Sequence, residues 1–293
     1  MKAAPFEYVR PHSVDEICAI LASDDSARVI AGGQTLVPMM AMRLARPTLL
    51  IDINRIRELS FIRDEDDRLV IGAVTRQRSA ERDPLVGARL PLLARAMPWI
   101  GHAATRARGT IGGSIANADP AAELALIATT LDATLAYRAG GADHNVSIRD
   151  FIVGPMTTAL PQDGCLTSVS FPIWHGRIGT GFAEVNARRS DFAFAAAAAQ
   201  IKLDADGRCE RIAIGIGAVA DIPFRLTEAE KQLAGTTLDA ARVRDSVRGA
   251  LAGVEPMSDP HASPAYRRRA AAELATRAIA EAHDEALERS HAH

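Results

Sequence analysis

A chain of 293 residues is long enough to form two modest domains with separate cores. Its 48% hydrophobic and 24% charged residues are typical of a soluble globular protein. The net charge of −2 excludes the strongly basic surface on which binding to nucleic acid or anionic lipid depends.

No apolar run approaches the length of a membrane span, and the first residues do not form a signal peptide. We therefore expect a cytoplasmic protein without a membrane span. The cysteines Cys18, Cys165 and Cys209 stand far apart, and none has a histidine at ligand spacing. This arrangement predicts no iron–sulfur cluster, structural zinc or other metal on the chain itself.

The first half of the sequence alternates short strand-like runs with helix-like runs. In chain order, the pattern predicts a helix at 15–22, a strand at 28–31, a helix at 36–44, strands at 49–53 and 68–73, and a helix at 91–97. An acidic turn at 64–67 leads into the last of these strands. The order indicates an α+β domain that runs to about residue 175, with a linker at 172–180.

The second half opens with a conflict between helix propensity and pattern. The alanine run at 195–199 favours a helix by intrinsic propensity. However, Asp206-Gly207 is a hairpin turn signal, and the isoleucines that follow it alternate with small residues. The hairpin outweighs the propensity, so strands are expected near 193–203 and 210–219.

From Thr227 onward the pattern is helical, and it ends in a long helix expected at 264–287. Together with the hairpin, this predicts a smaller sheet-plus-helix domain at 180–288. Gly215 and Gly217 lie within the second hairpin strand, where close packing explains them better than a nucleotide loop does.

Two stretches, Ala31-Gly-Gly-Gln-Thr35 and Thr110-Ile-Gly-Gly-Ser114, place paired glycines beside hydroxyl residues. Adjacent glycines let backbone amides approach phosphate oxygens, and a helix after each turn would direct its positive end at an anion. Asp119-Pro120 has the order of a helix N-cap and first helical residue. Either stretch alone is more often an ordinary tight turn, but the pair indicates one large anionic ligand held from two sides.

Other ligand-binding and catalytic patterns are missing from the sequence. It contains neither the Gly-x-Gly-x-x-Gly dinucleotide fingerprint nor the Gly-x-x-x-x-Gly-Lys-Ser/Thr phosphate loop. It also lacks Gly-x-Ser-x-Gly and His-Glu-x-x-His, and its histidines are scattered. We therefore expect no catalytic acid, base or nucleophile on this chain.

Residues 31–40 with 50–54, and residues 106–123, resemble the two flavin motifs of one family. The family is the FAD-binding medium subunit of molybdenum hydroxylases, which include carbon monoxide dehydrogenase, xanthine dehydrogenase and N-heterocycle dehydrogenases. The resemblance runs nearly end to end, from Phe6-Glu-Tyr8 to Tyr266-Arg-Arg268.

The resemblance implies a two-lobed FAD-binding domain of the vanillyl-alcohol oxidase type, with lobes of about 1–57 and 58–175. It also implies noncovalent FAD, with the first motif cradling the diphosphate and the second closing over it from the other lobe. The cofactor-binding residues that it implies are Ala31, Gly32, Gly33, Gln34, Thr35, Leu36, Thr110, Ile111, Gly112, Gly113, Ser114, Asn117, Asp119, Glu123, Leu160 and Phe192.

Several of these positions carry a second interpretation. Glu123 is equally well explained as an acid in the first turn of a helix, and Phe192 as a core aromatic of the second domain. Leu160 matches a position that packs beside either the flavin or the adenine. Ala107 replaces a frequent asparagine of the family and Ser190 a frequent glycine, which would alter a turn.

By the same resemblance, the chain is a flavoprotein subunit of a multisubunit oxidoreductase. Substrate is oxidised at molybdopterin on a large partner, and electrons pass through [2Fe–2S] clusters on a small partner to FAD here. They then reach NAD, oxygen or a quinone, and the expected assembly is a dimer of heterotrimers. The isolated cysteines agree with this scheme, because the chain cannot hold the clusters itself.

Two alternatives come from other functional classes. One is a stand-alone FAD-dependent oxidase or dehydrogenase of the same fold, which would need a substrate cavity with its own acid or base. The other is a scaffold that has lost FAD, against which the intact glycines and hydroxyls of both motifs argue. The sequence does not distinguish carbon monoxide, purine, N-heterocycle or aldehyde as the substrate.

Overall fold

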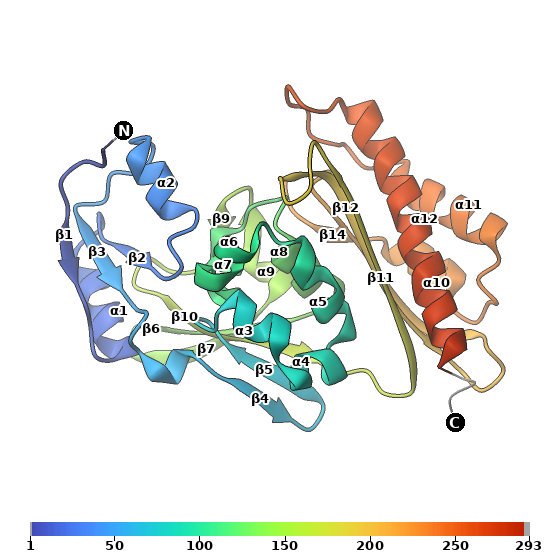
Figure 1. Cartoon of the computed structure of the whole chain (residues 1–293), viewed down its shortest axis with the longest axis horizontal. Coiled ribbons are helices and arrows are strands. Elements are labelled where there is room, and N and C mark those ends of the chain that lie inside the picture. The colour runs from blue at the N-terminus through green and yellow to red at the C-terminus, as the bar shows by residue number, and fades with distance from the viewer. Residues whose placement is uncertain (1, 290–293) are drawn as a thin grey trace.

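The computed structural model describes residues 2–289, in which three main sheets lie in a row along the longest dimension (Figure 1). A small parallel sheet forms the N-terminal end, and an antiparallel sheet with many short helices forms the middle. The C-terminal sheet stands at the other end, where the last helices of the chain cover its outer face. Within the described range, no helix combines the length and apolar character that crossing a membrane requires.

The N-terminal lobe is built on three parallel strands in the order β1-β3-β2. Its elements are β1 (Glu7–Val9), α1 (Val14–Ser23), β2 (Arg28–Ile30), α2 (Leu36–Ala41) and β3 (Leu49–Asp52). Ser13 begins α1 by accepting a hydrogen bond from Glu16 N at 3.2 Å, and Ile17 packs beneath the sheet against Ile51. Because β2 and β3 are parallel neighbours, the segments that follow them lie side by side.

The middle sheet is antiparallel in the order β4-β5-β10-β6-β7. Its strands are β4 (Ile62–Glu65), β5 (Arg68–Gly72), β6 (Thr134–Ala139), β7 (Ala142–Ser147) and β10 (Cys165–Pro172), with a separate hairpin of β8 (Ile152–Gly154) and β9 (Thr157–Thr158). Its helices are α3 (Gln77–Arg82), α4 (Pro84–Arg89), α5 (Pro91–Ala96), α6 (Ala103–Arg108), α7 (Ile111–Asn117), α8 (Glu123–Thr130) and α9 (Ile148–Phe151), with short 3-10 turns η1 (Arg57–Leu59) and η2 (Met97–Trp99).

The C-terminal sheet has four antiparallel strands in sequence order. Its elements are β11 (Arg177–Asn186), β12 (Ala193–Leu203), β13 (Cys209–Gly217), β14 (Phe224–Arg225), α10 (Thr227–Leu233), α11 (Ala240–Leu251) and α12 (Pro264–Glu288). Helix α12 lies along β11 and β12, while α5 and α8 of the middle part approach the sheet from the other side (Figure 1). The sheet is therefore covered on both faces.

Burial on both faces explains why an alanine run forms a strand. Ala195, Ala197 and Ala199 belong to the core beneath α10–α12, whereas Ala196 and Ala198 belong to the core of the middle part. Small side chains permit close approach on each side, so packing overrides the helix propensity of alanine. The predicted hairpin is confirmed.

Close packing on both faces of the sheet also explains the glycines in the neighbouring strands β11 and β13. A Cβ added at Gly181 would lie 1.9 Å from the carbonyl oxygen of Ala278 in α12. On the opposite face, a Cβ at Gly215 would lie 1.9 Å from Thr130 Oγ1 in α8. The interpretation of Gly215 as a packing glycine is thus confirmed, and it fixes the C-terminal sheet against the middle part.

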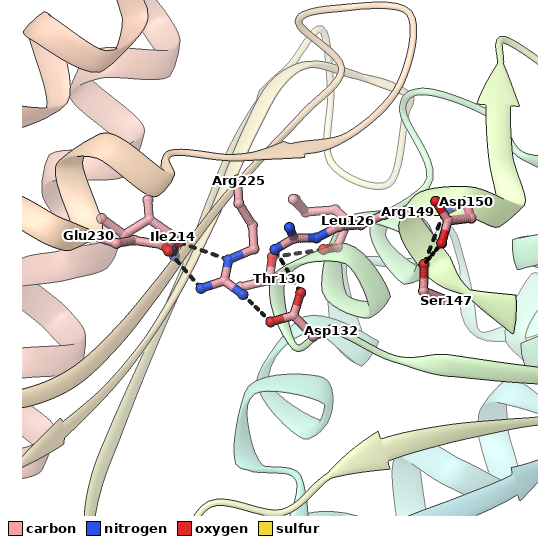
Figure 2. A network of polar contacts seen from close by, with 9 residues as sticks. All are labelled: Leu126, Thr130, Asp132, Ser147, Arg149, Asp150, Ile214, Arg225 and Glu230. Carbon is pink, nitrogen blue, oxygen red and sulfur yellow. Dashed lines mark hydrogen bonds and ion pairs between the residues drawn. The ribbon is translucent and has the colours of Figure 1, made fainter.

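A polar network crosses this same contact (Figure 2). The largely buried Arg225 pairs with Asp132, which follows α8, and with Glu230 of α10 at 2.6 Å. Glu230 also accepts a hydrogen bond from Ile214 N at 2.8 Å, and Arg149 pairs with Asp132 at 2.9 Å. Each buried charge has a partner, so the network joins the two parts without leaving a charge uncompensated.

Three boundaries differ from the sequence prediction. The helix expected at 36–44 ends at Ala41, because Arg43 adopts a φ of +60° and the chain turns back onto Met39 O. The expected acidic turn lies partly in β4, which extends to Glu65 through pairing with β5. The linker is also shorter than predicted, since β11 already begins at Arg177, opposite Leu203 of β12.

Candidate functional site

The first glycine motif borders a pocket of about 430 Å³ at the carboxyl end of β2. The pocket is lined by Tyr8, Ile30, Ala31, Gly32, Gly33, Gln34, Val37, Pro38, Asp52, Asn54 and Arg108. The lining comes from all three parallel strands or the segments beside them, and from the end of α6 in the next lobe.

The backbone between β2 and α2 carries a run of unpaired donors. Across the described residues, the N–H groups of Gly32, Gly33, Gln34, Thr35 and Leu36 meet no acceptor. The turn is possible because Gly33 adopts a φ of +70°, a conformation that costs glycine little. Successive free amides at a loop that leads into a helix are the typical groups that bind phosphate.

A hydrogen-bonded cluster supports this turn from below. Asn54 Nδ2 donates to Ala31 O at 2.8 Å and to Asp52 Oδ1 at 2.6 Å, and Tyr8 donates to the other oxygen of Asp52. Burial alone would raise the pKa of Asp52, but the hydrogen bonds from Tyr8 and Asn54 outweigh it and lower that pKa. The ionised Asp52 therefore anchors the segment that carries the free amides.

The residues just before the second glycine motif pack against Gly32 of the first motif. A Cβ added at Gly32 would lie 2.5 Å from Arg108 O and 2.8 Å from Gly109 Cα. Arg76 links the Arg108 segment to Asn54, because its guanidinium donates to Arg108 O and, at 2.6 Å, to Asn54 Oδ1, and Asn54 in turn holds Ala31 O of the first motif. The two motifs are thus neighbours in space, as their shared pattern predicts.

The glycines of the second motif form the first turn of α7 rather than a loop before it. Thr110 caps this helix, accepting a hydrogen bond from Gly113 N at 3.1 Å. Ile111 N and Gly112 N donate to carbonyls of Thr75 and Ala73 at 3.0 and 2.9 Å, and Ser114 N donates to Thr110 O at 3.2 Å. The first-turn amides of α7 therefore already have acceptors within the chain.

Packing explains one of these two glycines. A Cβ at Gly112 would lie 2.5 Å from the Cβ of Ala73, so the close approach of α7 to β5 requires glycine there. Gly113 is exposed instead, and a Cβ there would lie 2.5 Å from Thr110 Oγ1. What the second motif can offer a ligand is this open surface and the half-buried Ser114 hydroxyl.

The prediction that Asp119-Pro120 begins a helix is wrong. Helix α7 ends at Asn117, the next residue Ala118 has a φ of +48°, and α8 starts only at Glu123. Asp119 Oδ1 instead accepts a hydrogen bond from Ala121 N at 2.9 Å. The Asp-Pro pair therefore shapes the turn between two helices, which brings Pro120 O to Ala218 N of the C-terminal part at 2.8 Å.

Glu123 begins α8 at the same contact, near a second acid, Glu184. Burial raises the pKa of Glu123 to about 7, and burial together with nearby Glu123 raises the pKa of Glu184 in β11 to about 8. Asn186 donates to Glu184 Oε1 at 2.8 Å, whereas the buried Oε2 has no partner among residues 2–289. Sequence reasoning missed Glu184, since nothing near it in the chain indicates that it meets another acid.

Of the predicted site residues, Ala31, Gly32, Gly33 and Gln34 line the pocket, and all the others lie outside its lining. Leu160 is half-buried against the core of the middle part. Phe192 is 69% exposed in the turn between β11 and β12, so its interpretation as a core aromatic is wrong. Ser190 in the same turn has a φ of +67°, the conformation for which glycine is suited.

Comparisons with known proteins agree with this geometry. The family described as the FAD binding domain in molybdopterin dehydrogenase matches residues 4–174, and the CO dehydrogenase flavoprotein C-terminal domain matches residues 181–282. The glyceraldehyde dehydrogenase medium chain of Sulfolobus acidocaldarius is 35% identical over 94% of this chain and 98% of its own length.

Subunit alpha of the 6-hydroxypseudooxynicotine dehydrogenase complex of Paenarthrobacter nicotinovorans is 34% identical over 96% of each chain. Among solved structures, carbon monoxide dehydrogenase from Hydrogenophaga pseudoflava superposes with a TM-score of 0.94 at 32% identity. That match covers 97% of this chain and 99% of the other.

Fold and site together define an FAD-binding subunit of a molybdopterin oxidoreductase. The chain belongs to the family of FAD-binding medium subunits of molybdenum hydroxylases, which includes the carbon monoxide dehydrogenase medium chains. The expected family, α+β fold class and FAD cofactor are confirmed, as is the assignment to a multisubunit enzyme.

Proposed function

We propose that this chain binds FAD noncovalently and carries electrons within a molybdenum hydroxylase complex. The observation that supports this most directly is the run of free amides from Gly32 to Leu36 beside the pocket. Several adjacent donors fit a diphosphate, which presents several acceptor oxygens within a short span. When bound, FAD supplies the electron-transfer chemistry, and the protein supplies binding, orientation and electrostatics.

The sixteen residues that the sequence indicated have different roles in this proposal. Residues 31–36 hold the diphosphate, and the second motif closes the site through Ser114 and the open surface over Gly113. Thr110, Ile111 and Gly112 position that helix, because their backbone groups are already bonded within the chain. Asn117, Asp119, Glu123, Leu160 and Phe192 are proposed to border the rest of the cofactor.

We assign FAD binding to the two N-terminal sheets and a separate domain to the C-terminal sheet. A domain of residues 1–175 holds FAD between lobes of about 1–57 and 58–175, and a second domain spans 180–288. The contact between Gly32 and Arg108 supports this placement, since it joins the first lobe to the second directly beside the pocket. The C-terminal domain borders the site through the turn that carries Phe192.

The rest of the proposed reaction takes place on partner chains. Substrate is oxidised at molybdopterin on a large subunit, electrons arrive from [2Fe–2S] clusters of a small subunit, and they leave to NAD, oxygen or a quinone. The names of similar chains, a medium chain and a complex subunit, support such an assembly. We further propose a dimer of heterotrimers in the cytoplasm.

Purification of the tagged chain from its native host tests this assembly. The proposal predicts two co-purifying chains, one rich in paired cysteines, together with FAD, iron and molybdenum in the complex. Dithionite reduction followed by addition of NAD, oxygen or a quinone then identifies the acceptor by the rate at which flavin absorbance returns. A chain that purifies alone and oxidises a small substrate with FAD would contradict the proposal and indicate a stand-alone oxidase.

A further inference from the structure

Arg108 lies at the last turn of α6 and is one of the residues that line the pocket, together with Gly32 and Gly33. The side chain is exposed and forms neither a hydrogen bond nor an ion pair with any residue that the structure describes. Arg106 in the same turn differs, since it binds Glu81 at 2.9 Å and two carbonyls. One arginine of the pair thus holds the fold together, and the other is left free at the pocket.

The backbone that carries Arg108 is fixed on three sides. Its carbonyl accepts a hydrogen bond from Arg76, and the next carbonyl, of Gly109, accepts one from Gln77 N at 2.9 Å. Gly32 packs against the same two residues without space for a Cβ. A guanidinium on a fixed backbone loses less freedom when it binds a ligand than one on a mobile loop does.

Positively charged groups outnumber unpaired carboxylates around the pocket. The half-buried Arg76 stands beside Arg108, and its pKa is lowered by burial and by the charge of Arg108. The lining contains one carboxylate, that of Asp52, which already binds Tyr8, Asn54 and Arg10. Two neighbouring guanidinium groups and a run of free amides therefore lack a matching anion within the described chain.

We infer that Arg108 is a phosphate-binding residue of the cofactor site, whose guanidinium binds the FAD diphosphate opposite the amides of residues 32–36. This inference rests on the proposed function, since it assigns a further contact in the same pocket. Guanidinium suits the role because its planar donors match phosphate oxygens in pairs, and charge-assisted hydrogen bonds are the stronger ones. The geometry also explains why Arg108 needs no partner within the chain.

The test compares Arg108→Gln and Arg108→Lys with a matched control, Arg244→Gln, on the exposed face of α11. The full-length chain is freed of flavin, and the dissociation constant for FAD is measured by fluorescence quenching at several salt concentrations. ADP serves as a competitor that carries the diphosphate without the flavin. Thermal unfolding monitors the fold, which should be unchanged because the Arg108 side chain forms no hydrogen bond or ion pair within the described residues that the substitution would remove.

Arg108→Gln should weaken FAD and ADP by the same factor, about ten- to hundredfold, and flatten the salt dependence. Arg108→Lys should retain part of the affinity, and Arg244→Gln should match wild type. An Arg108→Gln affinity within twofold of wild type, or a loss for FAD without one for ADP, would overturn the assignment while leaving the proposed function intact. Failure of the wild-type chain to bind FAD at all would instead contradict the proposed function.

Discussion

Gly32 shows at the residue scale how a motif glycine can serve packing as well as binding. Its amide is free at the pocket, but the space for a side chain is filled by Arg108 O and Gly109 Cα. Gly33 differs, since its φ of +70° is what the turn itself requires. Gly32 is therefore needed for the contact between the lobes, and Gly33 for the backbone conformation of the turn.

Gly32→Ala should force the two motif segments apart and weaken FAD binding by about tenfold or more, because misplaced amides bind phosphate poorly. The control is Gly87→Ala, since an added Cβ at that helix position meets nothing within 4 Å. Isothermal titration of the flavin-free chains with FAD measures both. Equal affinities for the two variants would show that the contact of Gly32 with Arg108 does not position the site.

Ser190 gives a stability prediction at the same scale. It adopts a φ of +67° in the turn between β11 and β12, where an L side chain is strained. Ser190→Gly should therefore stabilise the fold by about 0.5–1 kcal/mol, once the entropy of the glycine is allowed for. Urea unfolding measures the change. A destabilised variant would mean that the serine makes a contact that outweighs its backbone strain.

Individual site residues were predictable only where they lay close together in the sequence. The first motif was found because five consecutive residues, Ala31 to Thr35, carry the whole turn. Tyr8, Asn54 and Arg76 come from three separate segments, so only folding brings them to that turn. Gly112 and Gly113 were recognised but misread as a loop, because their acceptors, Ala73 and Thr110, depend on tertiary contact or on the cap.

At the scale of elements, α7 connects the second motif to the fold. Thr110 both caps the helix and, through a bridge to Arg76, joins it to the segment that leads into α3. The helix has seven residues, too short to be stable by propensity alone. Its position therefore depends on the cap and on the packing of Gly112 against Ala73.

Thr110→Val should destabilise the fold by about 1 kcal/mol, because the valine side chain cannot accept the hydrogen bond from Gly113 N. FAD affinity should fall with it, since α7 carries Ser114. Thr110→Ser is the matched control, as it retains the capping oxygen and should stay close to wild type. Chemical unfolding and FAD titration provide the two measurements. A stable Thr110→Val variant with full affinity would show that the cap is dispensable.

Secondary structure was predictable from the sequence where local signals were strong. The hairpin turn at Asp206-Gly207 correctly outweighed the alanine run, and the apolar periodicity correctly predicted α12. The first part of β11 was instead taken for a linker. Its glycines look like turn residues in isolation, and only the close approach of α12 to Gly179 and Gly181 explains them as strand.

At the scale of the whole molecule, the contact between the middle part and the C-terminal part contains one group of paired charges and one group of two acids. Arg225 is neutralised by Asp132 and Glu230, as Figure 2 shows. Glu123 and Glu184 are instead two half-buried acids close enough for the charge of one to act on the other, and neither has a basic partner among the described residues. The second arrangement is favourable only while at least one of its two carboxyls remains protonated.

The acid pair predicts that the fold loses stability as pH rises. Both pKa values are raised by burial from 4.5, to about 7 for Glu123 and about 8 for Glu184. Between pH 4.5 and 8 the folded chain therefore holds more protons than the unfolded chain, so the free energy of unfolding decreases with pH. Above that window, two half-buried carboxylates repel each other across the contact between the parts.

Glu184→Gln should remove much of this dependence while keeping the acceptor for Asn186. Its melting temperature should match wild type near pH 5 and exceed it at pH 8.5. The same substitution at the exposed Glu58 serves as the control and should leave the profile of melting temperature against pH unchanged. Parallel wild-type and Glu184→Gln profiles would contradict the acid pair.

The flavin content of the purified chain tests the central claim most directly. An absorbance spectrum of the full-length chain is recorded, the protein is precipitated with acid, and the FAD released into the supernatant is quantified against protein. A noncovalent site in the pocket beside the free amides of residues 32–36 predicts oxidised-flavin bands, one FAD per chain, and complete release. A colourless chain that takes up no FAD on addition, or flavin that stays with the precipitate, would contradict it.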